Sequence, residues 1–517
     1  MEAAVVSQIA ASHASYSHHG AFASPDLERI LREVGGAMFQ SERHQDARNI
    51  GEPGATPRVL HVLTAARDVG GDTRFVWRWI QRDGARRHSL AVTSQGRFGV
   101  PNGLTDSVKR AGGRVHVLDQ SSVDPLSRAR QLRDLARDAD FVFLHIYPED
   151  VVPLIAFAVP DGMPPVVFLD QADHQFWLGA SIGDYFVQLR RSARPLAVER
   201  RGLDARRLGL LPIPLLPIGP GPTRAEAKRQ LGYDDDTVLL LTIARGLKYE
   251  PAGDPPFPTV LQEIIAEYPK AVVVAIGPDS SGPWESARAA TGGRVLALGR
   301  RSDTDLYFRA GDIYLDSFPV SSNTSLLEAA GYGLPLVSYI PNREGEDATA
   351  LEVLNAGAPG LDDTMLRAAD LVAYRRTVSE LIADPEWRRA LGDRTKALVD
   401  DLHAGPGWDR LLAEMYQAIP PLGTPRDEWS GPLRERIGEY DLLLKHFYST
   451  SRSLGSVIDE NVGGLCYPAR LRVLLGLIRL DRGFSFSMLL PNGLRRVLAG
   501  RLGNARQWFN RALAVRT

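Results

Sequence analysis

Residues 316–338 read Asp316-Ser-Phe-Pro-Val-Ser-Ser-Asn-Thr-Ser-Leu-Leu-Glu-Ala-Ala-Gly-Tyr-Gly-Leu-Pro-Leu-Val-Ser338, and this stretch decides the fold. We expect an apolar strand to end near Asp316 and a polar turn to lead into a helix that begins at about Thr324. The helix should stop at Gly331-Tyr-Gly333, and Pro335 starts the next apolar run. A strand, a helix and a second strand in this order predict a βαβ unit in a parallel sheet.

The start of this helix has the chemistry of an anion site. A helix begins with unpaired N–H groups and partial positive charge, which together suit a phosphate. Ser322 and Asn323 lie in the turn, and Thr324 and Ser325 add hydroxyl donors. Glu328 follows one turn later, where it can accept hydrogen bonds from a ribose diol. The same residues also suit an ordinary capped helix, because Ser, Asn and Thr are favoured at helix starts.

The pattern of buried strands and intervening helices extends outward in both directions. Continuous apolar runs favour a parallel sheet that is covered on both faces. In the second half these runs are 238–244, 271–276, 295–298, 313–315 and 336–338. In the first half they are 58–63, 89–93, 115–118, 141–144 and 166–169, with helices expected at 104–111 and 127–136.

The proline-rich segment Leu211–Pro222 divides the two sets of strands as a stiff connector. We therefore predict an α/β chain with two Rossmann-like domains that face a cleft. The predicted parts are an N-terminal extension over 1–57, a first domain over 58–216, a second domain over 217–420 and a helical basic tail over 421–517. The extension is expected to be loosely packed, and its His13, His18 and His19 show no metal-ligand spacing.

Two cations follow the first strand of the second domain. Arg245 offers a forked donor and Lys248 a point charge, and both suit a diphosphate, although solvated surface cations would have the same sequence. Carboxyl ends of parallel strands are where such folds bind ligands. Lys248 is one of six lysines among 61 basic residues, which makes its position more informative.

These segments resemble the GT-B glycosyltransferases over roughly 58–420. The resemblance implies that Arg245 and Lys248 hold the diphosphate of a nucleotide-sugar donor and that Glu328 holds its ribose. It also implies that Ser322, Asn323, Thr324 and Ser325 lie around the phosphates and that Arg300 lies near the base. Gly70 and Gly71 resemble the glycine turn of the first domain, although many turns need glycine.

The resemblance departs from the retaining branch of the family. That branch usually has two glutamates separated by seven residues, and Val320 stands where the first would be. The Thr-Ser-x-x-Glu arrangement is closer to the protein O-GlcNAc transferase-like branch, which inverts. An inverting reaction needs a general base near the acceptor hydroxyl.

Candidates for that base follow two strands of the first domain. We favour His174 as the base or an acceptor contact, with Asp173 or Asp170 as its orienting partner, and His145 as the second choice. A buried, hydrogen-bonded structural histidine is the alternative at both positions. No metal ion and no further cofactor are predicted, because the GT-B family uses helix ends and cations in place of a divalent ion.

Composition excludes several classes of protein. The formal net charge of −1 provides no field for nucleic acid, and a single cysteine, Cys466, excludes an internal disulfide. No leader sequence and no membrane-spanning run are recognised, so we expect a cytoplasmic protein. Residues 466–517 hold ten arginines and one acidic residue, which fits either peripheral contact with the inner face of a membrane or packing on the protein itself.

The sequence thus predicts a metal-independent hexosyltransferase, inverting in outcome, that moves a sugar from a nucleoside diphosphate-sugar. A saccharide, for example in polysaccharide biosynthesis, a lipid-linked acceptor and a protein acceptor all remain open. The alternatives are a nucleotide-sugar epimerase of the same fold and a non-catalytic sugar- or nucleotide-binding scaffold. No nucleic-acid partner is expected.

Overall fold

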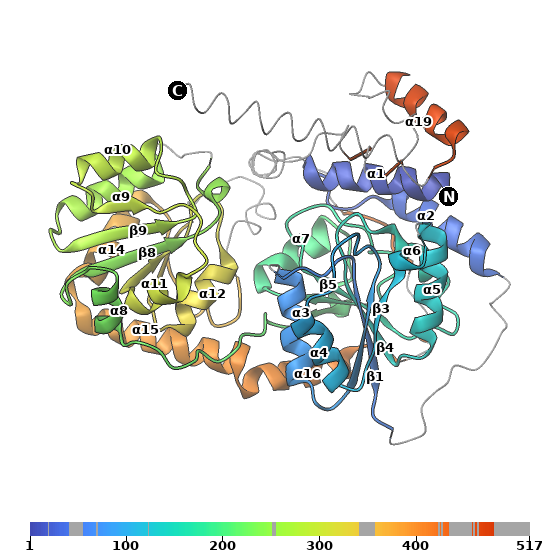
Figure 1. Ribbon diagram of the computed structural model, residues 1–517, viewed down its shortest axis with the longest axis horizontal. Helices are drawn as coiled ribbons and strands as arrows, with labels where there is room; N and C mark the ends of the chain where they lie inside the picture. The colour runs from blue at the N-terminus through green and yellow to red at the C-terminus, as the bar shows by residue number, and fades with distance from the viewer. Residues whose placement is uncertain are drawn as a thin grey trace.

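The structure, a computed structural model, describes most of both predicted domains and parts of the two ends. The described residues are 1–18, 20–40, 55–68, 71–122, 124–250, 255–340, 357–421, 424, 428–433, 457–458, 461–462 and 465–479. Two α/β domains lie side by side, each with a twisted sheet between layers of helices (Figure 1).

The described part of the first domain is built on a seven-stranded parallel sheet of order β3-β2-β1-β4-β5-β6-β7. Its strands are β1 (Arg58–Leu63), β2 (Arg87–Val92), β3 (Val115–Val117), β4 (Phe141–His145), β5 (Val166–Asp170), β6 (Tyr185–Gln188) and β7 (Leu208–Leu210). Its helices are α3 (Gly71–Arg82), α4 (Asn102–Arg110), α5 (Pro125–Arg137), α6 (Val151–Ala156) and α7 (Arg194–Glu199).

The described part of the second domain has a six-stranded parallel sheet of order β10-β9-β8-β11-β12-β13. Its strands are β8 (Val238–Ile243), β9 (Ala271–Ile276), β10 (Val295–Ala297), β11 (Ile313–Leu315), β12 (Leu336–Tyr339) and β13 (Leu366–Ala368). Its helices are α8 (Arg224–Gln230), α9 (Phe257–Ala266), α10 (Pro283–Ala290), α11 (Thr304–Ala310), α12 (Asn323–Gly331), α14 (Leu371–Ala383) and α15 (Pro385–Val399).

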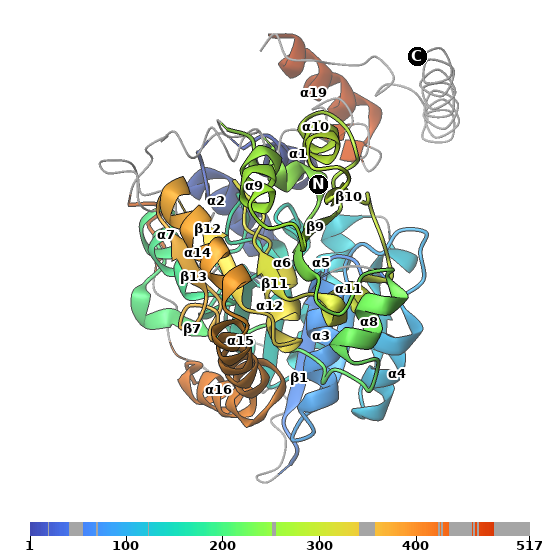
Figure 2. The same cartoon turned by 90° about the vertical axis from the view of Figure 1, so that its left-hand side faces the viewer.

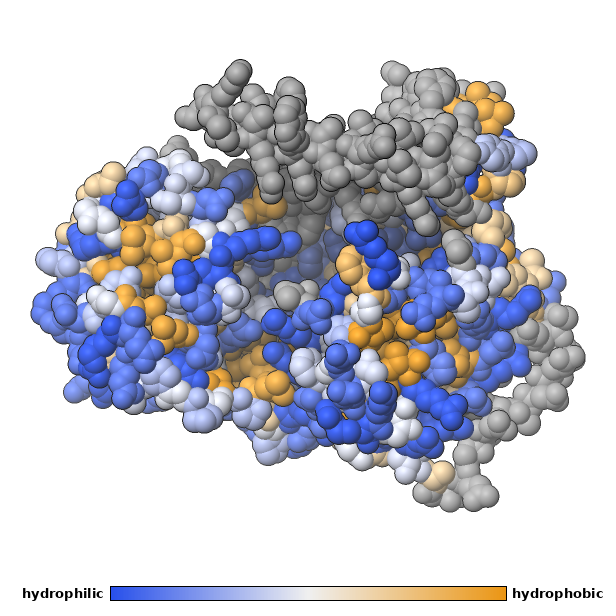
Figure 3. All heavy atoms as spheres, in the orientation of Figure 1, coloured by the Kyte–Doolittle hydropathy of each residue, from blue (hydrophilic) through white to orange (hydrophobic). Residues whose placement is uncertain are grey.

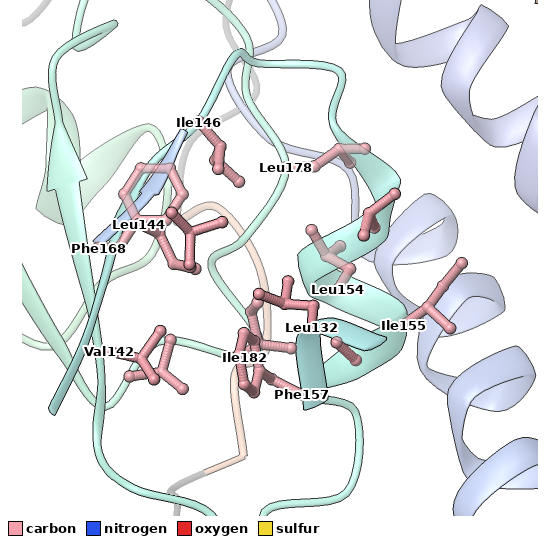
Figure 4. Close-up of a cluster of buried hydrophobic side chains, with 14 of the residues drawn as sticks. Leu132, Val142, Leu144, Ile146, Leu154, Ile155, Phe157, Phe168, Leu178 and Ile182 are labelled. Atoms are coloured by element: carbon pink, nitrogen blue, oxygen red, sulfur yellow. The ribbon is translucent and has the colours of Figure 1, made fainter. Parts of the chain in front are cut away.

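The core of the first domain lies between the central strands and α5 and α6. Val142 and Leu144 of β4 are fully buried and pack with Leu132 of α5 and Leu154 of α6 (Figure 4). Burying each such side chain contributes roughly 1.5–3 kcal/mol relative to leaving it in water. The continuous burial of β4 and β5 explains why their sequences show no polar alternation.

Helix α16 (Pro406–Ala418) joins the second domain to the first. The predicted boundaries assign it to the second domain, but Trp408 and Tyr416 pack against Trp79 and Phe143 of the first domain. The indole of Trp408 donates to the carbonyl of Pro212, 2.9 Å away. This helix follows the second domain in the chain, runs beneath the first domain in Figure 1 and packs on the first-domain strands.

The N-terminal residues are folded onto the first domain, so the expectation of a loosely packed extension was wrong for residues 1–40. Helices α1 (Glu2–Tyr16) and α2 (Pro25–Phe39) bury side chains in the same core as β4. The carboxylate of Glu28 accepts the backbone N–H groups of Gly179, Ala180 and Ser181 at 2.8, 2.9 and 2.6 Å. Periodicity gave no signal for the packing of α1, because that helix has no strongly one-sided apolar face.

Part of the basic tail packs on the protein itself. Helix α19 (Tyr467–Arg479) lies beyond α1 in Figure 1, and Leu474 shares a core cluster with Val5 and Ile9. Arg472 forms an ion pair with Glu2. Cys466 is exposed. None of the described helices is long and apolar enough to cross a lipid bilayer.

Candidate active site

The carboxyl ends of the two sheets meet at a shared cleft. The backbone N–H of Arg191, after β6, donates to the carbonyl of Gly357 in the second domain at 2.8 Å. The charge of Lys248 in the second domain also acts on His174 in the first domain. Figure 3 shows the surface hollowed between the two domains. Ligands of such folds bind at strand carboxyl ends, so we place the candidate site here.

The loop that follows β11 is organised around Asp316. Its carboxylate accepts the backbone N–H groups of Ser317 and Ser322, both at 2.9 Å, and the hydroxyl of Ser338 at 3.1 Å. Burial raises the pKa of Asp316, while these hydrogen bonds and the charge of Lys248 act in the opposite direction. The loop is therefore held in a fixed shape immediately before α12.

Lys248 reaches that loop from the other side. It lies in the short helix η5 (Gly246–Tyr249) after β8, and its ammonium donates to the carbonyl of Ser321 at 2.6 Å. Burial lowers the pKa of Lys248 to about 8, against the attraction of Asp316 and with the charges of Arg245 and Arg190 in support. Arg245 is exposed at the start of η5. Lys248 thus lies at the start of α12, and Arg245 is close enough for its charge to act on Lys248.

The start of α12 is open to an anion. Ser322 precedes the helix, and in the described residues its side chain makes no capping bond to the backbone. Its hydroxyl instead pairs with that of Ser325 at 3.2 Å. The side-chain oxygen of Asn323 is buried, and no described group bonds it. Thr324 is exposed. Among the described residues no side chain bonds the first-turn N–H groups, so these groups are open to an anion.

Glu328 faces the first domain across the cleft. Burial raises its pKa, and the charges of Arg74 and Arg78 on α3 lower it. Arg78 also donates to the carbonyl of Pro214, at 3.1 Å. The half-buried carboxylate of Glu328 thus lies within reach of the charges of two guanidinium groups of the first domain.

His174 belongs to a hydrogen-bonded group with Asp173 and Arg190. Its Nδ1 lies 2.8 Å from the carboxylate of Asp173. Arg190 donates to both oxygens of that carboxylate, at 2.5 and 2.7 Å. Burial acts to raise the pKa of Asp173, but Arg190 and His174 outweigh it and hold that pKa well below its ordinary value. Burial lowers the pKa of His174, with Asp173 opposing, so the ring is neutral at pH 7.

Asp170 has a different environment from Asp173. It is 1% exposed, and one of its oxygens accepts the indole N–H of Trp177 at 2.9 Å. Burial raises its pKa to about 6, with the charge of Arg201 opposing. Of the two carboxylates proposed as partner for His174, Asp173 makes the bond and Asp170 supports Trp177.

His145 lies inside the first sheet. It is 1% exposed, and its two ring nitrogens face His61 and Gln171 at 3.0 and 3.1 Å. Burial lowers its pKa to about 3. Both nitrogens are engaged in this way, so the geometry gives His145 no direct path to an acceptor hydroxyl.

The remaining predicted residues are less constrained. Gly70 lies outside the described residues, and Gly71 is the exposed first residue of α3. Arg300 is exposed after β10.

A cavity of about 530 Å³ lined by Asp83, Arg86 and Arg110 lies at the amino ends of the first-domain strands. Ligands of parallel α/β sheets bind at the carboxyl ends of the strands, so this cavity is not the candidate active site. In the described ranges, no group of three or more His, Cys, Asp or Glu residues is placed to hold a metal ion.

Sequence reasoning missed several residues of this site. Arg190 follows β6, a strand that was not predicted, and its pairing with Asp173 therefore had no signal. Arg74 and Arg78 both lie on α3, and their spacing of four residues marks one face.

No protein-family profile matches the sequence, and a search of curated proteins found no match. Several solved structures resemble the fold. Anabaena Alr3699/HepE in complex with UDP and glucose is 12% identical, with 70% of this chain and 100% of that one covered and a TM-score of 0.48. A mutant Thermobaculum terrenum O-GlcNAc transferase is 18% identical, with 80% and 77% covered and a TM-score of 0.49. A Rickettsia africae glycosyltransferase is 10% identical, with 70% and 99% covered and a TM-score of 0.49.

The likeness is one of fold. The two parallel sheets confirm the predicted α/β class with two Rossmann-like domains. What the protein does has to be argued from its own residues.

Proposed function

We propose that the protein transfers a sugar from a nucleoside diphosphate-sugar to an acceptor held mainly by the first domain. One observation carries this proposal: the start of α12, where the Ser322 side chain makes no capping bond, lies beside the Lys248 ammonium, and the charge of Lys248 acts on His174 of the first domain. An uncapped helix start and a cation form a site for a diphosphate, and a neutral imidazole is suited to take a proton.

The proposed reaction assigns a role to each side of the cleft. On the second domain, the first-turn N–H groups of α12 stabilise the leaving diphosphate together with Lys248 and Arg245. Glu328 accepts hydrogen bonds from the ribose. These contacts require no divalent cation, so we propose a metal-independent reaction.

On the first domain, His174 acts as the general base. Its Nδ1–H donates to Asp173, so the neutral ring has its lone pair on Nε2, where it can take the acceptor's hydroxyl proton. Arg190, which follows β6, holds Asp173 in place. The acceptor oxygen then attacks the anomeric carbon as the carbon–phosphate oxygen bond breaks, which inverts the configuration.

A transfer screen with a panel of nucleotide-sugars and saccharide, lipid-linked and peptide acceptors, read by mass spectrometry, tests this proposal. His174→Gln is the variant that tests the general base, because glutamine keeps a polar side chain but cannot take the proton. A product that requires both donor and acceptor, and that falls at least 100-fold in the variant, supports the transferase.

Two other outcomes contradict it. Conversion of the donor to an isomer without any acceptor would assign an epimerase. Donor binding with no product across the whole panel would assign a non-catalytic binding scaffold.

A further inference from the structure

Three buried histidines form a continuous chain through the first sheet. His61 on β1 lies 3.0 Å from His145 on β4 through one ring nitrogen and 3.0 Å from His88 on β2 through the other. His88 ends the chain 3.1 Å from the backbone carbonyl of Asp83, and His145 ends it 3.1 Å from the side-chain amide of Gln171. The chain thus runs from the amino edge of the sheet to its carboxyl edge.

The Asp83 end of the chain sets its direction. The backbone carbonyl of Asp83, 3.1 Å from Nε2 of His88, and the Asp83 carboxylate, 3.4 Å from it, can only accept, so Nε2 of His88 carries a hydrogen. In the chain of neutral rings that we infer, Nδ1 of His88 then accepts from His61. His61 then accepts at Nδ1 from Nε2–H of His145. Burial lowers the pKa of His61 and His145, and this keeps both rings neutral. Nδ1 of His145 is therefore an acceptor and needs a donor from Gln171.

This polarity sets the orientation of the Gln171 amide. Its NH₂ group faces Nδ1 of His145, so its carbonyl oxygen points elsewhere. The reverse orientation would set two lone pairs against each other at one link of the chain. Gln171 is half-buried, and no described group bonds its carbonyl oxygen. That oxygen is accessible at the end of β5, three residues before His174.

We propose that Gln171 binds the acceptor, with its carbonyl oxygen accepting a hydrogen bond from an acceptor hydroxyl while the histidine chain positions its amide. This role rests on the proposed transferase function. A fixed carbonyl oxygen attracts hydroxyl and amide hydrogens and repels phosphate and carboxylate groups. The group recognised here is therefore a neutral polyol face, such as that of a saccharide.

The histidines act only through Gln171. Three imidazoles joined by nitrogen–nitrogen distances of 3.0 Å leave one orientation for the amide, and a rigid amide loses little freedom when the acceptor binds. Without the chain the amide could rotate and present its NH₂ group instead.

The first test is nitrogen-15 NMR of the full-length protein labelled at histidine. We expect His61 and His145 to carry their hydrogen on Nε2 between pH 6 and 8, because burial lowers the pKa of both rings. A hydrogen on Nδ1 of His145 would overturn the proposal whatever the activity, because Gln171 would then present its NH₂ group to the cleft.

The second test separates acceptor from donor in the transfer assay, with UDP-glucose and p-nitrophenyl glycosides as probes. Gln171→Ala should raise the acceptor KM about tenfold, the loss expected for one hydrogen bond of about 1.4 kcal/mol, while the donor Kd stays within twofold. Gln175→Ala, in the same loop but outside the chain, is the matched control. An unchanged acceptor KM in Gln171→Ala overturns the proposal and leaves the transferase intact.

A comparison of two His88 variants tests whether the histidine chain positions Gln171. His88→Leu removes the donor to Asp83 and should raise the acceptor KM, whereas His88→Gln keeps one donor and one acceptor and should restore it. An acceptor KM that is equal in both variants contradicts positioning by the chain. If the wild-type protein turns over no donor at all, the proposed function fails and the role of Gln171 fails with it.

Discussion

Protonation of the buried histidine chain should make the first domain acid-sensitive, and His145 gives the clearest measurement. Its folded-state pKa is about 3, because burial disfavours the imidazolium. In the unfolded chain its pKa is about 6.5. Between these two values only the unfolded state takes up the proton, so stability is present above pH 6.5 and is lost as pH falls.

The size of the effect follows from the unfolded pKa. Each pH unit below 6.5 costs about 1.4 kcal/mol for one such histidine, so lowering the pH from 7 to 5 removes about 2 kcal/mol. Buried carboxylates, such as Asp170, change in the opposite direction over part of this range. Subtracting the free energy of unfolding of His145→Gln from that of wild type cancels the contributions of those carboxylates, because both proteins contain them.

The assay is urea unfolding followed by tryptophan fluorescence at pH 8, 7 and 5. Glutamine can donate to His61 and accept from Gln171, so the variant keeps the chain intact. The wild-type free energy of unfolding minus that of the variant should be nearly constant from pH 8 to 7. It should then fall by about 2 kcal/mol from pH 7 to 5. A constant difference across all three pH values would refute the reasoning.

Three further predictions concern single contacts. Asp173→Asn should lower kcat at least 100-fold with donor Kd unchanged, since His174 loses its anionic partner; a kcat within fivefold of wild type would contradict this. Glu28→Ala should reduce the free energy of unfolding by about 3 kcal/mol in urea, because three backbone N–H groups lose their acceptor; a loss below 0.5 kcal/mol would count against it. Glu328→Ala should weaken a nucleoside diphosphate about tenfold by calorimetry but leave its 2′,3′-dideoxy analogue unchanged; equal losses for both ligands would exclude a ribose contact.

The sequence predicted every strand with a long apolar run and missed three short ones. The strand β4 is buried on both faces, and its apolar residues show this directly. The missed strands β6, β7 and β13 have three or four residues each, and β7 and β13 contain Gly209 and Arg367. Such strands form because an existing sheet edge pairs with them, which a local pattern does not show.

The residues of the candidate site show the same difference between local patterns and long-range contacts. The start of α12 and Lys248 each lie within a continuous segment, so the local sequence pattern predicted both as parts of a site. The bonds of Arg190 to Asp173 and of His61 to its two neighbours join different strands. These contacts depend on the register and twist of the sheet, and one sequence alone carries no signal for them.

Calorimetry of a nucleoside diphosphate binding to wild type, Lys248→Met and Lys270→Met tests the central claim most directly. Lys270, an exposed lysine paired with Asp236, is the matched control. We expect Lys248→Met to weaken binding at least tenfold at pH 7, and Lys270→Met to stay within twofold. Wild-type affinity should also fall as pH rises through about 8, where the free Lys248 loses its proton, and this fall should vanish in Lys248→Met. Equal affinities for Lys248→Met and wild type would contradict a diphosphate site at the start of α12.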